Sequence, residues 1–330
     1  MNTALSNQCT LPVYEREFAA RHTLGGVVRE WAARKPGAPA IVNASRGQTV
    51  DWRTLEAVSA GLAAELLRLG FRKGDFLAAS LPLTTEHILL EYACFRIGVI
   101  HAPLDLRLTP AEVLRFLQMI GARGYAFPGR TPAADFRELG RAAGKHCPFV
   151  THRIQFSPAE ETIEGALPAG ELFAAAQAVT EEQRRALAAI EAAVSGHDGA
   201  QVIFTTGSTG APKPALLSHR GITAQNLCLG AAFGFGEHTR FLVNLPPSHV
   251  GGQAEALMTP LFWGGTAVTL EAFDAAKSLE AVARHGVNML GQIPAMFNMQ
   301  WRLAGYAAYD LSGLEAAIYG GQQVARPFLE

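Results

Sequence analysis

The sequence predicts an α/β protein with mainly parallel, doubly wound sheets, and two regularities of the chain carry this prediction. Short apolar runs alternate with longer segments whose apolar residues recur at helical spacing. Several of the helical segments end at a glycine, and a new apolar run begins a few residues later. Strands and helices that alternate in this order form right-handed βαβ units, which place parallel strands side by side.

The first part of the chain supplies several of these units. Short apolar runs at 40–42 and 49–50 predict a hairpin, and longer runs predict strands at 76–81 and 99–102. The segment Thr109-Pro110-Ala111-Glu112 is a capping box with proline at the first helical position, so it opens a helix that closes near Gly121. The other helices predicted in this part cover residues 15–35, 54–69 and 85–97.

Residues 128–199 are the least regular part of the chain, with a strand-like pair at 149–150. The capping box formed by Thr180 and Gln183 predicts a helix that runs to about residue 194. Residues 195–199 break this helix, so we predict a boundary there between two α/β lobes, 1–197 and 198–330. The second lobe continues the pattern, with strands expected at 202–204, 241–245, 266–270, 289–293 and 316–319, and helices at 221–229, 255–262 and 275–285.

Composition places the chain among ordinary globular proteins. Hydrophobic residues make up 49% and charged residues 17% of the sequence, and the net charge of −1 gives no attraction to nucleic acid or to an anionic membrane. The four cysteines lie far apart and the first residues lack a signal-peptide pattern, so we expect a reduced, cytoplasmic protein. No apolar stretch is long enough to span a membrane, and the ten histidines lack zinc-site spacing.

The most informative stretch follows the apolar run 202–204 and reads Thr205-Thr206-Gly207-Ser208-Thr209-Gly210-Ala211-Pro212-Lys213. Glycines let the backbone approach a ligand closely, while successive N–H groups and hydroxyls offer donors to phosphate oxygens. Lys213 adds a mobile positive charge. We therefore interpret the stretch as a phosphate-binding loop; the alternative is a solvated connector. Proline on both sides of Lys213 excludes a Walker P-loop.

This stretch resembles the phosphate-binding loop of the adenylate-forming (AMP-binding) superfamily, which includes acyl-CoA synthetases, luciferases and the adenylation domains of peptide synthetases. The family loop continues Pro-Lys-Gly, so Pro214 is a departure. Other strings similar to the family are Asp51-Trp52-Arg53-Thr54-Leu55, Gly74-Asp75, Leu81-Pro82 and the run from Ile97 to Asp105. The resemblance implies the N-terminal large domain of a carboxylate–CoA ligase, with ATP, Mg²⁺, CoA and a small carboxylic acid as its cofactors and substrates.

The resemblance also implies where the chain stops within the family pattern. The 330 residues do not include the Tyr-Gly-x-Thr-Glu type motif that helps to hold Mg²⁺, the ribose-binding aspartate, or the small C-terminal domain with the lysine of the adenylation step. We therefore expect this chain to bind nucleotide or acid and to turn over very slowly, if at all. The metal ligands and the oligomeric state remain unassigned.

Two further stretches resemble family motifs of the active site. Pro246-Pro247-Ser248-His249 is similar to a motif whose ring borders the carboxyl end of the bound acid; the alternative is a turn with a surface histidine. Tyr319-Gly320-Gly321-Gln322 is similar to a stretch that packs against adenine and the acyl group; the alternative is a strand-to-helix turn. The resemblance implies Lys213 and His249 as catalytic residues, and as nucleotide-binding residues Thr205, Thr206, Gly207, Ser208, Thr209, Gly210, Lys213, Gly320, Gly321 and Gln322. For His101 and Asp105 we favour a structural role.

The residues around these motifs indicate the class of acid. An amino acid would need a carboxylate after His249 to pair its ammonium group, and residues 250–254 offer none; Glu255 is the nearest acid. Apolar and small side chains predominate after His249, near Gly291 and at 320–323, and they favour an aryl, alicyclic or medium-chain acid over a dicarboxylate. The alternatives are an adenylation domain that loads an amino or aryl acid onto a carrier-protein thiol, and a non-catalytic nucleotide-binding module.

Overall fold

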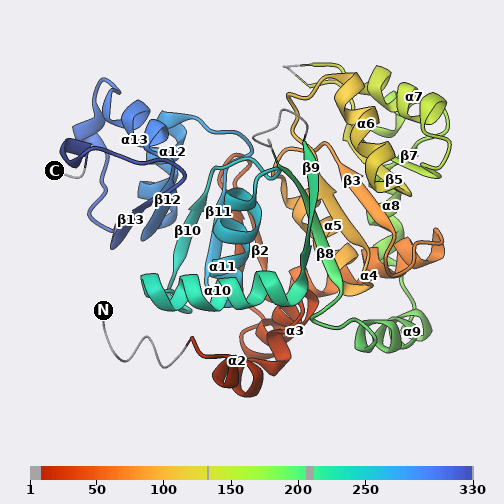
Figure 1. The fold of residues 1–330 in the computed structure, drawn as a ribbon, viewed down its shortest axis with the longest axis horizontal. Coiled ribbons are helices and arrows are strands. Elements are labelled where there is room, and N and C mark those ends of the chain that lie inside the picture. Colours follow the sequence, from red (N-terminus) through yellow and green to blue (C-terminus); the bar gives the residue numbers. More distant parts are fainter. Residues whose placement is uncertain (1–8, 132–133, 206–211, 329–330) are drawn as a thin grey trace.

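Two mainly parallel sheets form the framework of the protein (Figure 1), as the alternation of strands and helices predicts. The computed structural model describes residues 9–131, 134–205 and 212–328. Sheet A contains, in spatial order, β13 (Ala316–Tyr319), β12 (Met289–Gln292), β10 (Arg240–Val243), β11 (Thr266–Thr269), β1 (Pro39–Asn43) and β2 (Gln48–Asp51). The predicted hairpin is confirmed, because β1 and β2 pair antiparallel, whereas the other neighbours in sheet A are parallel.

Sheet B contains, in spatial order, β7 (Leu167–Pro168), β6 (His152–Phe156), β5 (Gly124–Pro128), β3 (Phe76–Ala79), β4 (Ile100–Pro103), β8 (Gly199–Thr205) and β9 (Lys213–Ser218). The strand predicted at 149–150 is wrong, since β6 begins at His152. Strand β9 was not predicted at all. It pairs antiparallel with β8 at the edge of the sheet, a position that tolerates Pro214 because one side of the strand needs no hydrogen bonds.

The chain exchanges strands between the two sheets. Strands β1 and β2, from the first part of the chain, complete sheet A through the parallel pairing of Ile41 with Ala267. Strands β8 and β9 complete sheet B, where Gln201 pairs with His101. The lobe boundary predicted at residue 197 therefore does not separate the sheets, because parallel pairing joins segments that are distant in the sequence.

Helices cover both faces of each sheet. The α-helices are, in chain order, α2 (Leu11–Glu17), α3 (Leu24–Arg34), α4 (Trp52–Arg68), α5 (Thr85–Arg96), α6 (Pro110–Ile120), α7 (Arg137–His146), α8 (Ala169–Gln177), α9 (Glu181–Ala192), α10 (His219–Phe233), α11 (Met258–Phe262), α12 (Ala275–His285) and α13 (Pro294–Trp301). Helices α6 and α7 pack on the outer face of sheet B, and α12 and α13 pack on the outer face of sheet A. The inner faces share one hydrophobic core with α3, α4, α5, α10 and α11.

Alternation along the strands explains how both faces are covered. In β3, Leu77 belongs to the shared core and Ala78 to the outer core of sheet B. In β10, Val243 belongs to the shared core and Leu242 to the outer core of sheet A. Successive residues of a strand point to opposite faces of the sheet, so a continuous run of apolar residues supplies buried side chains to both faces. The two sheets are consequently held together by a single packed interior.

Three predicted helices differ from the observed ones, and one of them, expected over 221–229, extends beyond both predicted ends as α10. The helix expected over 15–35 is divided into α2, a 3₁₀ turn (Ala19–Arg21) and α3, because Thr23 caps the start of α3 by accepting a hydrogen bond from the N–H of Gly26. The helix expected over 255–262 starts earlier as the π-helix η3 (Gly251–Leu257), which continues into α11. Helix α12 has the predicted bounds.

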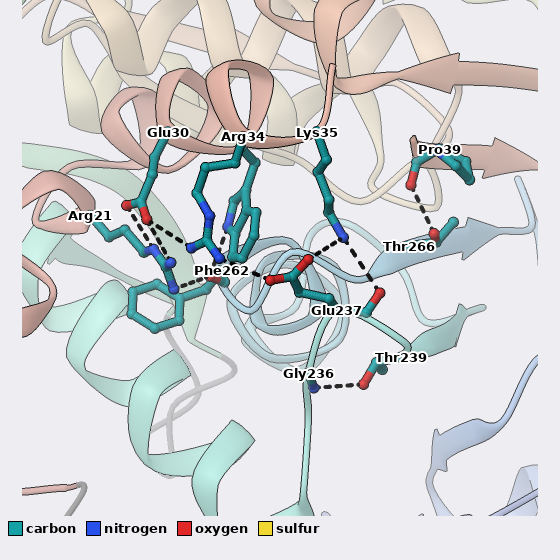
Figure 2. Close-up of polar contacts among 11 residues, drawn as sticks. Arg21, Glu30, Arg34, Lys35, Pro39, Gly236, Glu237, Thr239, Phe262 and Thr266 are labelled. Atoms are coloured by element: carbon teal, nitrogen blue, oxygen red, sulfur yellow. Dashed lines mark hydrogen bonds and ion pairs between the residues drawn. The ribbon is translucent and has the colours of Figure 1, made fainter. Parts of the chain in front are cut away.

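Polar contacts attach α3 and the turn before it to the end of α11 and to the loop before β10, as Figure 2 shows. The guanidinium of Arg21 donates to both carboxylate oxygens of Glu30 at 2.8 and 2.7 Å and to the carbonyl of Phe262 at 3.1 Å. Arg34 donates to Glu237 at 2.9 Å. The Arg21 group also lies 4.5 Å from the ring centre of Trp31, so its charge is paired and its planar face is covered.

His219, which begins α10, belongs to the shared interior. Its side chain is fully buried, its ring lies edge-on to Phe95, and its Nδ1 accepts the N–H of Leu24 at 3.3 Å. Burial lowers the pKa of His219 to about 4, against an attraction from Asp198 that raises it. The imidazole is therefore neutral at physiological pH, and it links α10 to α3.

The contact between α4 and α8 yields a stability prediction. A Cβ on Gly61 would lie 2.1 Å from the carbonyl oxygen of Ala176, so Gly61→Ala should destabilise the protein by about 1–3 kcal/mol in urea unfolding. In an isolated helix the same change would stabilise by roughly 1 kcal/mol. Gly170→Ala in α8 is the matched control, since no atom lies within 4 Å of its Cβ position. A Gly61→Ala variant as stable as Gly170→Ala would contradict the packing.

The buried histidine yields a prediction about pH. Histidine in an unfolded chain has a pKa of about 6.5. As the pH falls from about 6.5 to 4, His219 is therefore protonated in the unfolded chain and stays neutral in the folded protein. Unfolding free energy should therefore fall over this range, by about 3 kcal/mol from this group. Urea titrations at several pH values should show a smaller fall in His219→Gln than in the wild type. Parallel curves for the two proteins would disprove this assignment.

Candidate functional site

A cleft of about 870 Å³ opens where the carboxyl ends of strands from both sheets meet. Its walls come from the segments after β4, β8, β10, β12 and β13, together with parts of α6, α10 and α13. Ligands of doubly wound sheets bind at this edge of the strands. Four of the predicted site residues line the cleft: Thr205, His249, Gly320 and Gly321. Lys213 and Gln322 are not among its lining residues.

The predicted phosphate-binding loop connects the two antiparallel strands β8 and β9. Thr205 ends β8, Lys213 begins β9, and the two residues pair across the ladder with the Thr205 hydroxyl donating to the Lys213 carbonyl at 3.4 Å. Both residues are exposed. The predicted contacts Thr206, Gly207, Ser208, Thr209 and Gly210 lie outside the described residues. The described residues on either side of this stretch, Thr205 and Pro212, both line the cleft.

His249 lies in the turn between β10 and the π-helix η3, with its side chain exposed at the cleft. The N–H of Gly251 donates to His249 Nδ1 at 3.1 Å. A neutral ring that accepts at Nδ1 carries its proton on Nε2, so Nε2 is the nitrogen that can donate to a ligand. Gly252 permits this turn, because a Cβ there would lie 2.2 Å from the carbonyl oxygen of Pro246. π-helical segments are frequent at functional sites.

Ser248 and Asp105 connect the two sheets at the rim of the cleft. The Ser248 hydroxyl donates to Asp105 Oδ2 at 3.3 Å, and Arg107 donates to both oxygens of the same carboxylate at 2.9 and 2.7 Å. The hydrogen bond from Arg107 holds the pKa of Asp105 below its usual range. Asp105 is therefore ionised and already paired. His101, for which a structural role was also favoured, is fully buried and does not line the cleft.

Tyr319, Gly320 and Gly321 form the wall of the cleft at the end of β13. Gly321 has a φ of +79°, a conformation that side chains with a Cβ rarely adopt, so the turn requires glycine. The three residues are exposed, which leaves their backbone accessible to a flat group.

Apolar side chains make up a further wall, which sequence reasoning missed almost entirely. Phe116 of α6 stacks on Phe204 of β8, with ring centres 4.1 Å apart. Further apolar side chains that line the cleft include Leu108, Leu229, Phe233, Phe235, Phe241, Ile293 and Met296. They come from elements that are far apart in the sequence, and their local patterns are those of ordinary helices and strands. Glu255 also lines the cleft and accepts a hydrogen bond from Gln225 at 3.1 Å.

Other ligand types find less support in the described ranges. Within them, no three His, Cys, Asp or Glu side chains are grouped so that they could hold a metal ion. Across the described part of the chain, every helix is too short or too polar to cross a membrane. Ser218, which caps α10, and His219 are not among the lining residues of the cleft.

Known proteins share this sequence pattern and fold. The family model described as AMP-binding enzyme matches residues 28–330. The chain is 25% identical over 317 residues to the mitochondrial medium-chain acyl-CoA ligase of Macaca fascicularis, covering 91% of this chain and 50% of that protein. It is 26% identical over 306 residues to the 4-chlorobenzoate–CoA ligase of an Arthrobacter species, covering 91% and 53%. The chain thus spans about half the length of the curated relatives it matches.

A solved structure of a fatty acyl CoA synthetase from Mycobacterium tuberculosis superposes with a TM-score of 0.71 at 24% identity, over 91% of this chain and 55% of that one. At this identity the likeness shows the fold alone, and it agrees with the arrangement of sheets A and B described above. The match to the family model is the stronger finding, because it extends over nearly the whole chain and includes the residues that line the cleft. The chain therefore belongs to the family of AMP-binding enzymes.

Proposed function

We propose that this chain forms the N-terminal large domain of an ATP-dependent carboxylate–CoA ligase. The observation that carries the proposal is the composition of the cleft. One cavity adjoins the end of the predicted phosphate loop at Thr205, the exposed His249, the Gly320–Gly321 backbone and a wall of aromatic and aliphatic side chains. A polyphosphate group and an apolar acid can therefore meet in one place.

The proposed reaction has two steps. A carboxylate oxygen of the acid attacks the α-phosphorus of ATP, the bond to the bridging oxygen breaks, and pyrophosphate leaves with that electron pair. The thiol of CoA then adds to the carbonyl carbon of the acyl-adenylate and, after losing its proton, displaces AMP. Positioning and charge stabilisation supply the catalysis, so we assign the triphosphate to Lys213 and to the donors of the loop 205–210. Mg²⁺ is the expected counter-ion of the phosphates, with ligands still unassigned.

His249 is proposed to bind the carboxyl end of the acid. Its Nδ1 is already occupied by the Gly251 N–H, so the neutral ring has Nε2–H to donate to a carboxylate. A hydrogen bond to a charged group is worth about 1.5–3 kcal/mol. This contact would orient one carboxylate oxygen while the other attacks phosphorus.

The apolar wall supports an aryl, alicyclic or medium-chain acid. Arg107, the arginine that lines the cleft, is paired with Asp105, and the Glu255 carboxylate would repel a second acid group. The same Glu255 favours a second candidate function, an adenylation domain that loads an amine-bearing acid onto a carrier-protein thiol, because a carboxylate on the wall could pair an ammonium group. We also infer a reducing compartment such as the cytoplasm from the wide sequence spacing of the four cysteines.

A panel of acids tests the substrate class. We expect the full-length protein to catalyse pyrophosphate exchange into ATP with octanoate, benzoate or cyclohexanecarboxylate and to ignore succinate. Binding of an apolar group in the cleft and exclusion of a second carboxylate are the physical reasons. Exchange with amino acids alone would replace this proposal by the carrier-protein alternative, and a follow-up with CoA in place of a carrier protein would identify the thiol acceptor.

Two substitutions test the assigned roles in the full-length protein. His249→Ala should lower kcat/KM for the acid about 10- to 100-fold and leave the KM for ATP within about twofold. Lys213→Ala should have the opposite pattern, with the larger loss on the ATP side. His146→Ala and Lys145→Ala are matched controls, because both side chains are exposed on α7 and neither lines the cleft. If His249→Ala has the kinetics of the wild type, His249 does not bind the acid and is only a surface histidine in a turn.

A further inference from the structure

Five polar side chains lie in the interior between the sheets, and each has an exposed fraction of zero: His87, Glu91, His101, Gln201 and Gln253. His87 and Glu91 are on α5, which runs between the sheets. The other three lie close in sequence to the cleft. His101 is in β4, which ends at the lining residue Pro103. Gln201 is in β8, which ends at Thr205, and Gln253 is in η3, between the lining residues Gly251 and Glu255.

The carboxylate of Glu91 is the centre of this network. Its Oε1 accepts a hydrogen bond from Gln253 Nε2 at 2.6 Å and another from Gln201 Nε2 at 2.8 Å, and it lies 3.2 Å from His101 Nδ1. Among the described residues, Glu91 Oε2 has no hydrogen-bond partner. A carboxyl group in the interior costs several kcal/mol unless such contacts compensate it, so its position here is closely determined.

The two histidines extend this network from Glu91 towards Pro82. His87 Nδ1 lies 3.0 Å from the Pro82 carbonyl, and His87 Nε2 lies 3.3 Å from His101 Nε2. Among the described residues, His101 Nδ1 has no hydrogen-bond partner, so its 3.2 Å distance from Glu91 Oε1 is a close approach and not a hydrogen bond. Burial, with the charge of His101, lowers the pKa of His87 to about 3, which agrees with a neutral His87.

We propose that Glu91 is a positioning residue that fixes the two sides of the cleft relative to each other. Through Gln201 it holds β8, which leads into the phosphate loop, and through Gln253 it holds η3, which follows His249. The assignment of one side to nucleotide and the other to acid rests on the proposed function. The fixing of the two segments does not, because it follows from the contacts alone.

The arrangement gives each glutamine a separate effect. Gly251, the first residue of η3, donates its N–H to His249, so movement of η3 moves that ring and the neighbouring Glu255. Gln201 pairs with His101 in the parallel register of β8 and β4, and Thr205 follows on the same strand. Loss of the Gln253 contact should therefore loosen the His249 side, and loss of the Gln201 contact should loosen the phosphate-loop side.

Hydrogen–deuterium exchange of the 330-residue chain without ligand tests the positioning. Gln253→Leu, which keeps the side chain's size and removes its donor, should speed exchange across residues 250–257 about tenfold and leave 199–205 unchanged. Gln201→Leu should give the reverse pattern. Gln155→Leu is the matched control, since Gln155 is equally buried in sheet B and contacts Ser157 and Glu161 instead of Glu91. Equal acceleration of both segments in all three variants would overturn the proposal.

Calorimetry on the same variants connects the positioning to ligands. Gln253→Leu should weaken binding of octanoate or benzoate about tenfold and leave the affinity for ATP within about twofold of the wild type. Gln201→Leu should instead weaken binding of ATP. In the Glu91→Leu background, adding Gln253→Leu should have no further effect on exchange in 250–257, because the shared partner is already gone. If Gln253→Leu speeds exchange in 250–257 as much in the Glu91→Leu background as in the wild type, Glu91 does not have the proposed role. If the wild-type chain binds neither ATP nor acid, the proposed function fails, while the exchange patterns still decide the positioning.

Discussion

Two parallel pairings determine how this chain is arranged, β1 with β11 in sheet A and β4 with β8 in sheet B. Each brings together segments that are far apart in the sequence, and each lies next to the central helices that both sheets bury. Because the strands are parallel, their carboxyl ends collect at one edge. The cleft lies between the carboxyl ends of the strands of both sheets. Thr205, at the end of a strand of sheet B, and His249, after a strand of sheet A, both line it. Fold and candidate site therefore depend on the same pairings.

Local signals were sufficient for several of the helices. The bounds of α12 and the capping boxes of α6 and α9 follow from residues within one turn of each helix end, and the structure confirms them. The strand exchange was not predictable from such signals, because neither segment's own sequence pattern indicates that Ile41 pairs with Ala267. Strand β9 was hidden for another reason. Pro212 and Pro214 indicate a loop, but Pro214 lies within β9, where the edge position makes it compatible with a strand.

The site divides in the same way. Thr205, His249, Gly320 and Gly321 were found through motifs, and the structure places all four around one cleft, although their roles stay predictions. The apolar wall could not be predicted, since Phe116 and Phe204 have the pattern of ordinary core residues and become neighbours only through packing of α6 on sheet B. The buried network was equally invisible, because a lone Glu or Gln in an apolar run gives no indication of its partner.

The polar network invites the question of why a carboxylate is buried where the sheets meet. Stability alone is a weak explanation, because apolar residues of similar size often replace buried ion pairs at no cost. Apolar contacts, however, permit one element to slide over another with little change in energy, whereas hydrogen bonds are lost when their geometry changes. Glu91 contacts β8 and η3 through a single oxygen atom, so neither segment can shift without breaking a bond to a group that water does not reach. A cleft formed by two sheets needs this kind of constraint, since no single sheet determines the distance between its walls.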